Sequence, residues 1–584
     1  MRQTEGPTSR EALILCMPPA ALTSSEEASR YLAAVIVDAN SLNDGDLPPD
    51  EVCVIGAGAV GIALALTLAE AGVHVTVVEA GGERRDEAVQ DAYRGTVIDP
   101  DLHSPLHDYR ERRLGGTSTI WGGRCMPLDR IDFAARDWIA ESGWPIGPEA
   151  LAPYYPAANR WCEAGRFDYD AASALPADAQ PMIAGFDGAA FATDRLERFS
   201  CPTDFGRRYR QRLAALPNVR LLLDAAVTAI RLDPAGVRVA GLSLRTKAGR
   251  TLELAPRQVV LCAGGLESAR LLLANRDVHP HGIGNHHDVL GRYYMSHLAG
   301  TIGTLRITAP VWHGYDLADD GTYCRRRLAL REEAQVAHRI GNFVARLHHP
   351  RIADPRHGAG QLSALYLGRA LVPRIYRARL TGEGEGGAGY ARHIGNVLRQ
   401  PGAVARFARD TLTKRWLAER KYPSVVATPV DGAYMLDFHA EQEPCRDSRV
   451  TLSDERDALG MPRLAVDWRY TRGDVRTVEV ALQLLTEDIR HSGCGTFDYD
   501  PEQVEREMTR YGAYPGHHIG TVRMGGDPRH SMVDAECRVH GLANLHVAGA
   551  AVFPTSSQAN PTLTAVALAL RLADRLIETT RKAA

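Results

Sequence analysis

The pattern of apolar positions is clearest between residues 51 and 82 of the 584-residue chain. A short apolar run at residues 52–55, rich in β-branched side chains, is typical of a buried parallel strand. An apolar helical pattern follows, and then a second apolar strand that ends at Glu79. Between the first strand and the helix lies a GxGxxG motif: Gly56, Gly58 and Gly61. This order predicts the strand–turn–helix–strand unit that binds dinucleotides.

Each part of this motif has a task in binding a dinucleotide. Gly56 permits the tight turn, Gly58 lets the backbone approach a pyrophosphate, and Gly61 lets the helix pack against the strand. Glu79 follows about twenty residues later, where a carboxylate accepts both hydroxyls of a ribose and repels a 2′-phosphate. The motif therefore predicts FAD or NAD and disfavours NADP, and by itself it does not separate the first two.

Strand patterns return from Asn218 to Val260. Alternation and the turn at residues 247–250 predict an antiparallel meander that returns to a buried strand at residues 259–262. A helix that begins near Gly264 follows this strand. The meander and the helix continue the α/β character of the first unit.

The C-terminal stretch repeats the pattern of a buried strand followed by a helix. Leu545 to Ala548 reads as the strand, and Gly549 and Ala550 form a close-approach turn. A long apolar helix is then expected, with Asn560 as the N-cap and Pro561 at the first helical position. The positive end of this helix would stabilise a negatively charged ring edge in front of it.

Two other segments are less regular. Residues 23–38 predict a helix in an N-terminal extension, residues 1–47. Residues 345–425 are rich in arginine and carry a Gly/Glu-rich run, 382–390, between helical stretches. They predict either a basic surface for a membrane or an acidic partner, or a helical insertion packed on the body, and the interrupted apolar face favours the insertion.

Composition narrows the class of protein. The chain has 45% hydrophobic and 24% charged residues, ordinary globular values, and its length implies more than one folding unit. A formal net charge of −3 gives no overall attraction to nucleic acid or to an anionic membrane. The sequence contains no apolar run of about eighteen residues or more, so it predicts no membrane-spanning helix. Ten cysteines without CxxC pairs, and an N-terminus without a signal-peptide pattern, lead us to expect a cytoplasmic protein.

A glycine-rich stretch, RLGGTSTIWGGR at residues 113–124, is unsuited to a stable helix or a packed strand. It predicts a loop whose backbone lies against a flat ligand, and a plain Gly-rich turn is the alternative. Histidine pairs such as His103 and His107 lack an HExxH motif or a flanking carboxylate or cysteine cluster, so we expect no metal. No GxSxG elbow is present for acyl chemistry.

Six motifs in chain order are GAGAVG with Glu79, RLGGTSTIWGG, CAGGLESARLLL, EQEPCRDSRVTLSDERDALGMP, HHIGTVRMG and ANPTLTAVALA. Together they resemble the glucose-methanol-choline family of FAD-dependent alcohol oxidoreductases over nearly the whole chain, and residues 300–430 are the weakest stretch. STIW and ANPTLTA are most similar to the pyranose oxidase and glycoside dehydrogenase branch.

The resemblance implies an α/β fold with two domains. The Rossmann-like FAD-binding domain is discontinuous and is expected at residues 48–165, 200–294 and 516–584. The substrate-binding domain, with an antiparallel β-sheet, is expected at residues 166–199 and 295–515.

The resemblance also places the site residues. The catalytic base falls on His517 and its partner on Asn560, with His518 as a rival for the base. A neutral imidazole takes the hydroxyl proton while hydride leaves carbon for flavin N5, and the amide holds the same oxygen. The residues expected to contact FAD are Gly56, Gly58, Gly61, Glu79, Arg113, Gly116, Thr117, Trp121, Gly122, Val227, Gly264, Gly549, Ala550, Pro561 and Thr562.

Two departures from the family pattern matter. The histidine that links flavin covalently in pyranose oxidases is replaced by Ile120, so FAD is expected to bind noncovalently. Trp121 and Gly122 are expected near the isoalloxazine ring, and Gly122 lacks the threonine side chain of the pyranose oxidase pattern, which leaves reactivity with oxygen open.

The predicted reaction is oxidation of an alcohol to a carbonyl. The expected substrate is a sugar, a glycoside or a sugar-bearing natural product, and reduced FAD is reoxidised by O₂ or another acceptor. A nonsugar alcohol, such as a sterol, a choline-like amine or an aliphatic alcohol, is an alternative substrate. A flavoprotein that uses FAD without net oxidation is another alternative. An NAD-dependent dehydrogenase is disfavoured, because the C-terminal motifs would have no function if the cofactor were nicotinamide.

Overall fold

The computed structural model describes residues 35–45, 47, 51–371, 389–429, 432–514 and 516–583. Most of the predicted N-terminal helix, most of the Gly/Glu-rich run and Pro515 lie outside these residues. Among the described helices, none is both long enough and apolar enough to cross a bilayer. The cysteines of the described part form no disulfides.

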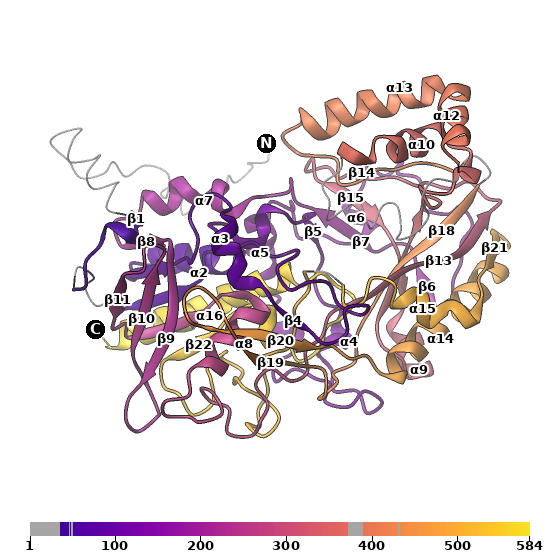
Figure 1. The fold of residues 1–584 in the computed structure, drawn as a ribbon. Coiled ribbons are helices and arrows are strands. Elements are labelled where there is room, and N and C mark those ends of the chain that lie inside the picture. Colours follow the sequence, from indigo (N-terminus) through magenta and orange to yellow (C-terminus); the bar gives the residue numbers. More distant parts are fainter. Residues whose placement is uncertain are drawn as a thin grey trace, which may run out of the picture.

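A parallel sheet lies at the centre of one half of the molecule (Figure 1). Its strand order is β1 (Ile36–Asp38), β8 (Val219–Leu223), β3 (Val75–Val78), β2 (Val52–Ile55), β12 (Gln258–Leu261) and β22 (Leu545–Val547). Every neighbouring pair in the sheet runs parallel. All residues of β2 and β3 are buried, as expected for parallel strands covered on both faces, and this explains their continuous apolar runs.

Two predictions about this sheet need correction. Residues 36–38 form the edge strand β1 rather than the end of a helix, because the β-branched Ile36 and Val37 pair with β8. Residues 219–223, read as the start of the meander, form β8 itself. The meander is confirmed one strand later and consists of β9 (Ala225–Leu232), β10 (Val239–Thr246) and β11 (Thr251–Leu254).

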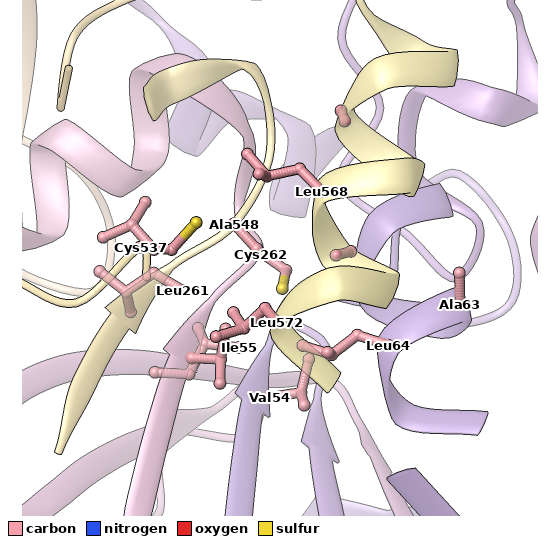
Figure 2. Packing of buried hydrophobic residues seen from close by; sticks show 14 of the residues in the cluster. Val54, Ile55, Ala63, Leu64, Leu261, Cys262, Cys537, Ala548, Leu568 and Leu572 are labelled. Atoms are coloured by element: carbon pink, nitrogen blue, oxygen red, sulfur yellow. The ribbon is translucent and has the colours of Figure 1, made fainter. Parts of the chain in front are cut away.

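Helices pack on the parallel sheet and bury its core (Figure 2). They are α2 (Ala59–Glu70), α5 (Tyr155–Trp161), α7 (Phe205–Ala214), α8 (Gly264–Ala274) and α16 (Thr562–Ala583). Leu568 and Leu572 of α16 belong to the same buried cluster as Leu64 of α2 and Val54 and Ile55 of β2, and Leu572 lies near Ile55. The C-terminal helix therefore closes the core around the first strand and helix of the chain.

An antiparallel sheet forms the other half, on the right of Figure 1. Its order is β21 (Gly495–Asp498), β13 (Leu298–Ile307), β18 (Ala433–Ala440), β17 (Phe343–His348), β16 (Leu328–Leu330) and β6 (Phe191–Ala192). Helix α14 (Arg472–His491) packs against this sheet and shares a second apolar core with it. The antiparallel sheet expected for the second half of the protein is thereby present.

Two small sheets join the halves. One has the order β14 (Asp316–Leu317), β15 (Tyr323–Arg326), β7 (Leu196–Phe199) and β5 (Arg124–Cys125). The other has the order β19 (Arg449–Arg456), β20 (Pro462–Asp467) and β4 (Gly95–Val97). Strands β4 and β5 come from the segment predicted as FAD-binding and pair with strands of the predicted substrate domain. The exact domain boundaries stay a prediction.

A helical layer lies at the top right of Figure 1, above β14 and β15. It contains α10 (Gly360–Leu367), α12 (Tyr390–Arg399), α13 (Pro401–Asp410) and a π-helical turn, Thr411–Trp416. A small apolar cluster that includes Leu362 and Tyr366 packs this layer together with Ile352 and Ala427 at its two ends in the chain. Short helices complete the fold: α3 (Glu87–Gln90), α4 (Arg130–Phe133), α6 (Ala171–Ala174), α9 (Glu332–His338) and α15 (Val504–Met508).

Candidate active site

One continuous cavity of about 510 Å³ brings the predicted site residues together. It is lined by the turn after β2, the end of β3, the loop of residues 116–124 and the starts of α8 and α16. Both His517 and Asn560 line it. All residues predicted to contact FAD line it as well, except Gly61 and Arg113.

The glycines of the first turn differ in what surrounds them. A Cβ atom on Gly61 would lie 1.9 Å from the carbonyl oxygen of Gly56, and one on Gly56 would lie 2.8 Å from that of Cys262. A Cβ atom on Gly58 would meet no protein atom within 4 Å. Gly56 and Gly61 thus permit packing within the protein, whereas Gly58 leaves space in the cavity for a ligand.

Three helix starts face the cavity. Ala59 of α2, Gly264 of α8 and Thr562 of α16 all line it. The unpaired N–H groups and the positive dipole end of a helix start attract negative charge. The cavity therefore suits a ligand that carries phosphates and an anionic ring edge.

Glu79 is held in the cavity wall by backbone donors. The N–H groups of Ala57 and Gly81 donate to its two carboxylate oxygens at 2.8 and 3.1 Å. Burial raises its pKa, and these hydrogen bonds act in the opposite direction. Each oxygen has a further lone pair, as required for binding a ribose diol.

Arg113 lies outside the cavity. Its guanidinium faces the carboxylate of Asp204 at 4.0 Å. Two neighbouring arginines, Arg110 and Arg112, line the cavity instead. The RERR sequence before the glycines was the signal for them, but sequence alone does not tell which arginine turns inward.

Glu267, in the CAGGLESARLLL motif, anchors these two arginines. Its carboxylate accepts hydrogen bonds from Arg110 and Arg112 at 3.1 Å and from Arg270 at 3.3 Å. Burial raises the pKa of Glu267, but the three arginines outweigh that effect and hold it at about 2. The ionised carboxylate thus fixes three cations at the cavity wall.

His517 and Asn560 lie within hydrogen-bonding distance of each other. The amide nitrogen of Asn560 is 3.2 Å from Nε2 of His517. The amide oxygen of Asn560 is buried and has no hydrogen-bond partner among the described residues. The N-capping role predicted for Asn560 is wrong: the carbonyl of Pro561 accepts the first helical bond, from Ala565, and the Asn560 side chain turns to His517.

His297 orients His517, and no motif in the sequence indicated that His297 belongs to the site. Its Nε2 lies 3.1 Å from the carbonyl oxygen of Ser556, which can only accept, so this nitrogen carries the proton. Burial lowers the pKa of His297 to about 4, so the ring is neutral and its Nδ1 is an acceptor. Nδ1 of His517 lies 2.6 Å away and therefore donates. The Nε2 atom of His517 keeps a lone pair.

His518 lies in another environment. Its ring packs near Tyr294, at a centroid distance of 6.1 Å, and near His103 at 6.4 Å. Burial lowers its pKa well below the usual value, and Arg110 and His103 add to the effect. The structure places the neighbouring ring of His517, rather than that of His518, beside Asn560.

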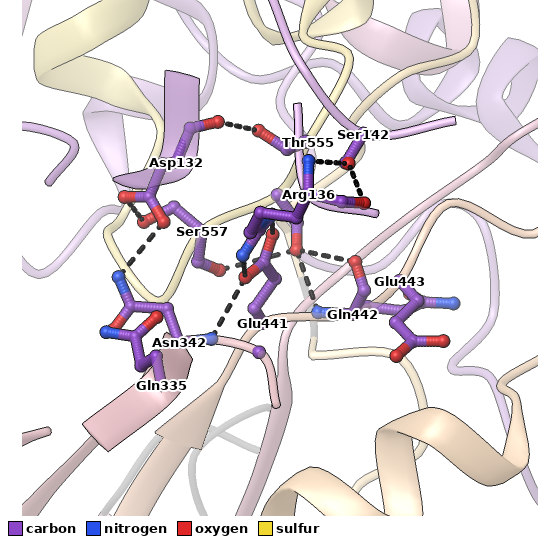
Figure 3. Close-up of polar contacts among 12 residues, drawn as sticks. Asp132, Arg136, Ser142, Gln335, Asn342, Glu441, Gln442, Glu443, Thr555 and Ser557 are labelled. Carbon is purple, nitrogen blue, oxygen red and sulfur yellow. Dashed lines mark hydrogen bonds and ion pairs between the residues drawn. The ribbon is translucent and has the colours of Figure 1, made fainter. Parts of the chain in front are cut away.

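A buried polar network fixes the loop that leads to Asn560 (Figure 3). Thr555 donates to the backbone carbonyl of Asp132 at 2.9 Å, and Ser557 donates to its carboxylate at 2.6 Å. Nearby, Arg136 donates to both oxygens of Glu441, at 2.7 and 2.6 Å. The backbone N–H of Gln442, next to Glu441, donates to the hydroxyl of Ser556 at 2.8 Å. The loop is therefore tied to segments from both halves of the chain, which fixes the position of Asn560.

A second group of lining residues lies on the side of Tyr514, whose ring centroid is 4.8 Å from that of His517. It comprises Arg124, Phe199, Tyr315, Pro423 and Ser424. This part of the wall therefore mixes aromatic surface with hydroxyl and guanidinium groups.

Buried charges stand behind this wall. Glu197 lies between Arg346, which hydrogen-bonds to it, and Arg124, whose Nε atom is 3.6 Å from its Oε2. Burial raises the pKa of Glu197, but Arg124 and Arg346 outweigh it and hold the pKa at about 2. Several atoms of these three side chains have no hydrogen-bond partner within the described part: Nη1 of Arg124, Oε2 of Glu197 and both Nη atoms of Arg346. The same holds for Nδ1 of the buried His439.

Comparison with known proteins agrees with this geometry. Residues 51–359, more than half of the chain, match the family model of FAD dependent oxidoreductases. Residues 444–569 match the model of GMC oxidoreductases, the glucose-methanol-choline group. The chain belongs to the FAD-dependent oxidoreductases, and its C-terminal segment is that of a GMC oxidoreductase. The predictions of FAD as cofactor and of an enzyme that acts on alcohol groups are thereby confirmed.

Individual relatives of this FAD-dependent oxidoreductase are distant. Paromamine 6′-oxidase of Streptomyces fradiae is 25% identical over 570 residues, which span 90% of each chain. The fructose dehydrogenase large subunit of Gluconobacter japonicus is 27% identical over 386 residues, 65% of this chain and 58% of that protein. A solved structure of a fungal aryl-alcohol oxidase aligns with a TM-score of 0.53 and 14% identity, over 92% of this chain and 100% of the other. The fold is therefore shared.

The residues of the cavity fit FAD. Gly58 and the start of α2 would hold the pyrophosphate, and Glu79 would hold the ribose of the adenosine. Trp121 and Gly122, with the start of α16, would lie against the isoalloxazine ring. Ile120 also lines the cavity, and its side chain has no nucleophile for a covalent flavin link.

Proposed function

We propose that this chain oxidises a hydroxyl group of a sugar, a glycoside or a sugar-bearing natural product to a carbonyl. The observation that carries the proposal is the pair formed by His517 and Asn560 in the cavity wall. Their facing nitrogens are 3.2 Å apart, so both can reach one substrate oxygen. Bound FAD would supply the hydride acceptor.

His517 acts as the base in this proposal. Its Nε2 lone pair takes the proton of the substrate hydroxyl, while the amide N–H of Asn560 donates to the same oxygen and steadies the charge that develops there. The carbinol carbon is then able to release hydride. The amide oxygen of Asn560, unpaired in the described part, is free to accept a further hydrogen bond from the ligand.

His297 has a positioning role. His297 accepts a hydrogen bond from Nδ1–H of His517 and donates one to the carbonyl of Ser556. The ring of His517 is thereby fixed in the tautomer that leaves Nε2 unprotonated. Because His297 is neutral at pH 7, this arrangement needs no buried charge.

The polar wall around Tyr514 supports a carbohydrate substrate. Ser424, Tyr315 and Arg124 present hydroxyl and guanidinium groups to the cavity, and aromatic rings offer flat surface for the faces of a sugar ring. The fructose dehydrogenase large subunit, whose name gives a sugar as substrate, aligns over 65% of this chain. A sterol or aliphatic alcohol would leave these polar groups without partners.

FAD is noncovalently bound in this proposal, because Ile120 stands where the pyranose oxidase pattern has the linking histidine. The electron acceptor is O₂ or another oxidant. A Cβ atom on Gly122 would meet no protein atom within 4 Å, so the cavity has free space at this position.

The test is an anaerobic visible spectrum of the purified holoenzyme before and after addition of sugars, aminoglycosides, other glycosides and simple alcohols. We expect the flavin band to bleach with a sugar or glycoside and to persist with aliphatic alcohols and sterols. Denaturation in acid should release the flavin into the supernatant, as noncovalent binding requires.

The possible outcomes separate the alternatives. Bleaching with nonsugar alcohols alone would contradict the substrate class but keep the reaction. A flavin spectrum that none of the compounds changes would favour use of FAD without net oxidation. Flavin that stays with the precipitated protein would contradict noncovalent binding.

A further inference from the structure

Helix α12, in the helical layer, turns its polar side inward, toward α10 and the loop that precedes α10. Nδ1 of His393 lies 3.0 Å from the hydroxyl of Ser363, and the amide of Asn396 donates to the carbonyl of Pro355 at 2.9 Å. Both side chains are buried. The helix is thus attached through hydrogen bonds, whereas a surface helix ordinarily buries its apolar face.

Large apolar side chains of this layer lie on its outside instead. We call them the Trp416 face: Ile394, Leu398, Leu412, Trp416 and Leu417. Ile394 and Leu398 are one turn apart on α12, and Leu398 is 72% exposed. Trp416 and Leu417 are each 73% exposed. Exposed apolar side chains that gather in one layer indicate a surface that binds something.

Positive charge accompanies the Trp416 face. Residues 389–421 contain eight Lys and Arg against two Asp and Glu, whereas the whole chain has a net charge of −3. Arg392, Arg399, Arg406 and Lys421 are exposed, and no carboxylate of the described residues forms an ion pair with them. The charge is therefore available to an anionic partner.

We propose that the Trp416 face docks on the surface of an anionic lipid bilayer. Trp and Leu would enter the headgroup region, and the arginines and lysines would reach the lipid phosphates. Helix α13 runs along the outer edge of the molecule in Figure 1, so the layer can approach an extended surface. A bilayer matches both the apolar and the basic side chains without a shaped groove. The sequence alone favoured a helical insertion packed on the body, and this proposal takes the alternative, a basic surface for a membrane.

The Trp416 face continues into the wall of the active-site cavity. Pro423 and Ser424, a few residues beyond Leu417, line the cavity, and Ser424 is exposed. The guanidinium of Arg420 donates to the backbone carbonyls of Glu163 and Phe199, both at 3.0 Å. Docking would therefore place this edge of the cavity beside the lipid headgroups.

The first test is sedimentation of the holoenzyme with vesicles of phosphatidylglycerol and phosphatidylcholine, compared with vesicles of phosphatidylcholine alone. We expect binding to the anionic vesicles, weakened by added salt. The double variant Trp416→Ser with Leu417→Ser should lose this binding and keep its flavin. Val237→Ser with Val278→Ser is the matched control, because both valines are exposed and lie in other loops.

The second test changes charge. Arg399→Gln with Arg406→Gln should weaken binding to the anionic vesicles roughly thirtyfold, because the variant loses the electrostatic binding energy of two arginines near an anionic surface. Arg238→Gln with Arg257→Gln removes two exposed arginines elsewhere and should change binding less than twofold.

Three results would overturn the proposal. These are no binding to anionic vesicles, equal binding to both kinds of vesicle that salt does not weaken, and unchanged binding by the Trp416 and Leu417 variant. Size-exclusion chromatography with light scattering measures the oligomeric state and so tests the alternative occupant, a second copy of the chain. A dimer that the same variant converts to a monomer, without vesicle binding by the parent, would assign the face to a second copy of the chain.

Discussion

The position of one proton on His517 determines whether this site can begin an oxidation. The ring of His517 has an acceptor, Nδ1 of His297, on one side and a donor, the amide nitrogen of Asn560, on the other. The carbonyl of Ser556 sets the direction of these hydrogen bonds through His297. A carbonyl never donates, so the protons of both rings point toward it. The lone pair that remains faces Asn560 and the cavity.

Removal of the base should separate chemistry from cofactor binding. His517→Ala should keep FAD bound, because the residues that line the phosphate end of the cavity are unchanged, and should slow reduction of the flavin by about two to four orders of magnitude. Anaerobic stopped-flow absorbance with the substrate found in the panel measures this. His518→Ala is the comparison, and fast reduction in His517→Ala with slow reduction in His518→Ala would exchange their roles.

Removal of the acceptor behind His517 should have a smaller effect that a conservative change rescues. His297→Leu should slow flavin reduction by about one to two orders of magnitude, since it frees the ring to take the other tautomer. His297→Asn keeps an acceptor near the position of Nδ1 and should restore most of the rate.

The pH profile distinguishes this positioning role from a general loss of structure. Because the pKa of His297 is about 4, its Nδ1 remains an acceptor at every pH above that value. We expect the acid limb of kcat/KM to shift in His297→Leu and to match the parent in His297→Asn. Equal rates and equal profiles in the parent and in His297→Leu would remove His297 from the mechanism.

At the scale of elements, the turn between β2 and α2 performs two separate tasks. The carbonyl of Gly56 lies where a side chain on Gly61 would begin, which lets α2 pack closely against its strand. Gly58 has an ordinary extended backbone, with φ −80°, and faces open cavity. One glycine thus serves packing and the other serves the ligand.

Substitutions at these two glycines should therefore fail in different ways. Gly61→Ala should lower the free energy of unfolding by about 3 kcal/mol or more, because the new methyl group overlaps a backbone oxygen in a packed core. Gly58→Val should leave the melting temperature of the flavin-free protein within a few degrees of the parent and abolish FAD binding. Differential scanning calorimetry and the flavin absorbance of the purified proteins measure the two effects. A fully loaded Gly58→Val protein would contradict the placement of the pyrophosphate.

At the scale of the whole molecule, buried ion pairs connect segments that are far apart in the chain. Arg270 on α8 pairs with Glu267 and also with Asp457, at 2.7 Å, after strand β19. Arg136 and Glu441 pair across the two halves. Such pairs fix the geometry of the halves, and removal of one partner leaves the other charge buried without compensation.

These pairs should make stability depend on acid pH. The pKa of Glu267 in the folded protein is about 2, below its ordinary value of 4.5, so its stabilising contribution is complete above about pH 5. The contribution decreases as the pH falls from about 4.5 toward 2, by roughly 3 kcal/mol in all. Glu267→Gln should be less stable than the parent at pH 6, and the difference in melting temperature should narrow as the pH falls to 3. A difference that stays constant would show that Glu267 is not ionised in the folded protein.

Much of the cofactor site could be predicted from local sequence. The strand–glycine–helix–acid pattern fixes its own geometry over about thirty residues, because the turn, the helix start and the carboxylate are set by neighbours in the chain. The loop with Trp121 and the start of α16 were found in the same way. Val227 required the family resemblance, since nothing in its own neighbourhood points to a ligand.

What the sequence by itself determined is therefore the FAD unit, the α/β class and the identity of the residues at the cavity. Only the tertiary structure decided that β1 extends the sheet, that Arg112 rather than Arg113 faces the cavity, that Asn560 turns away from its helix to His517, and that His297 stands behind the base. The tertiary structure also decided which side of α12 faces outward. Each of these depends on contacts between residues that are far apart in the chain, and local propensity carries no information about which partner a side chain will meet.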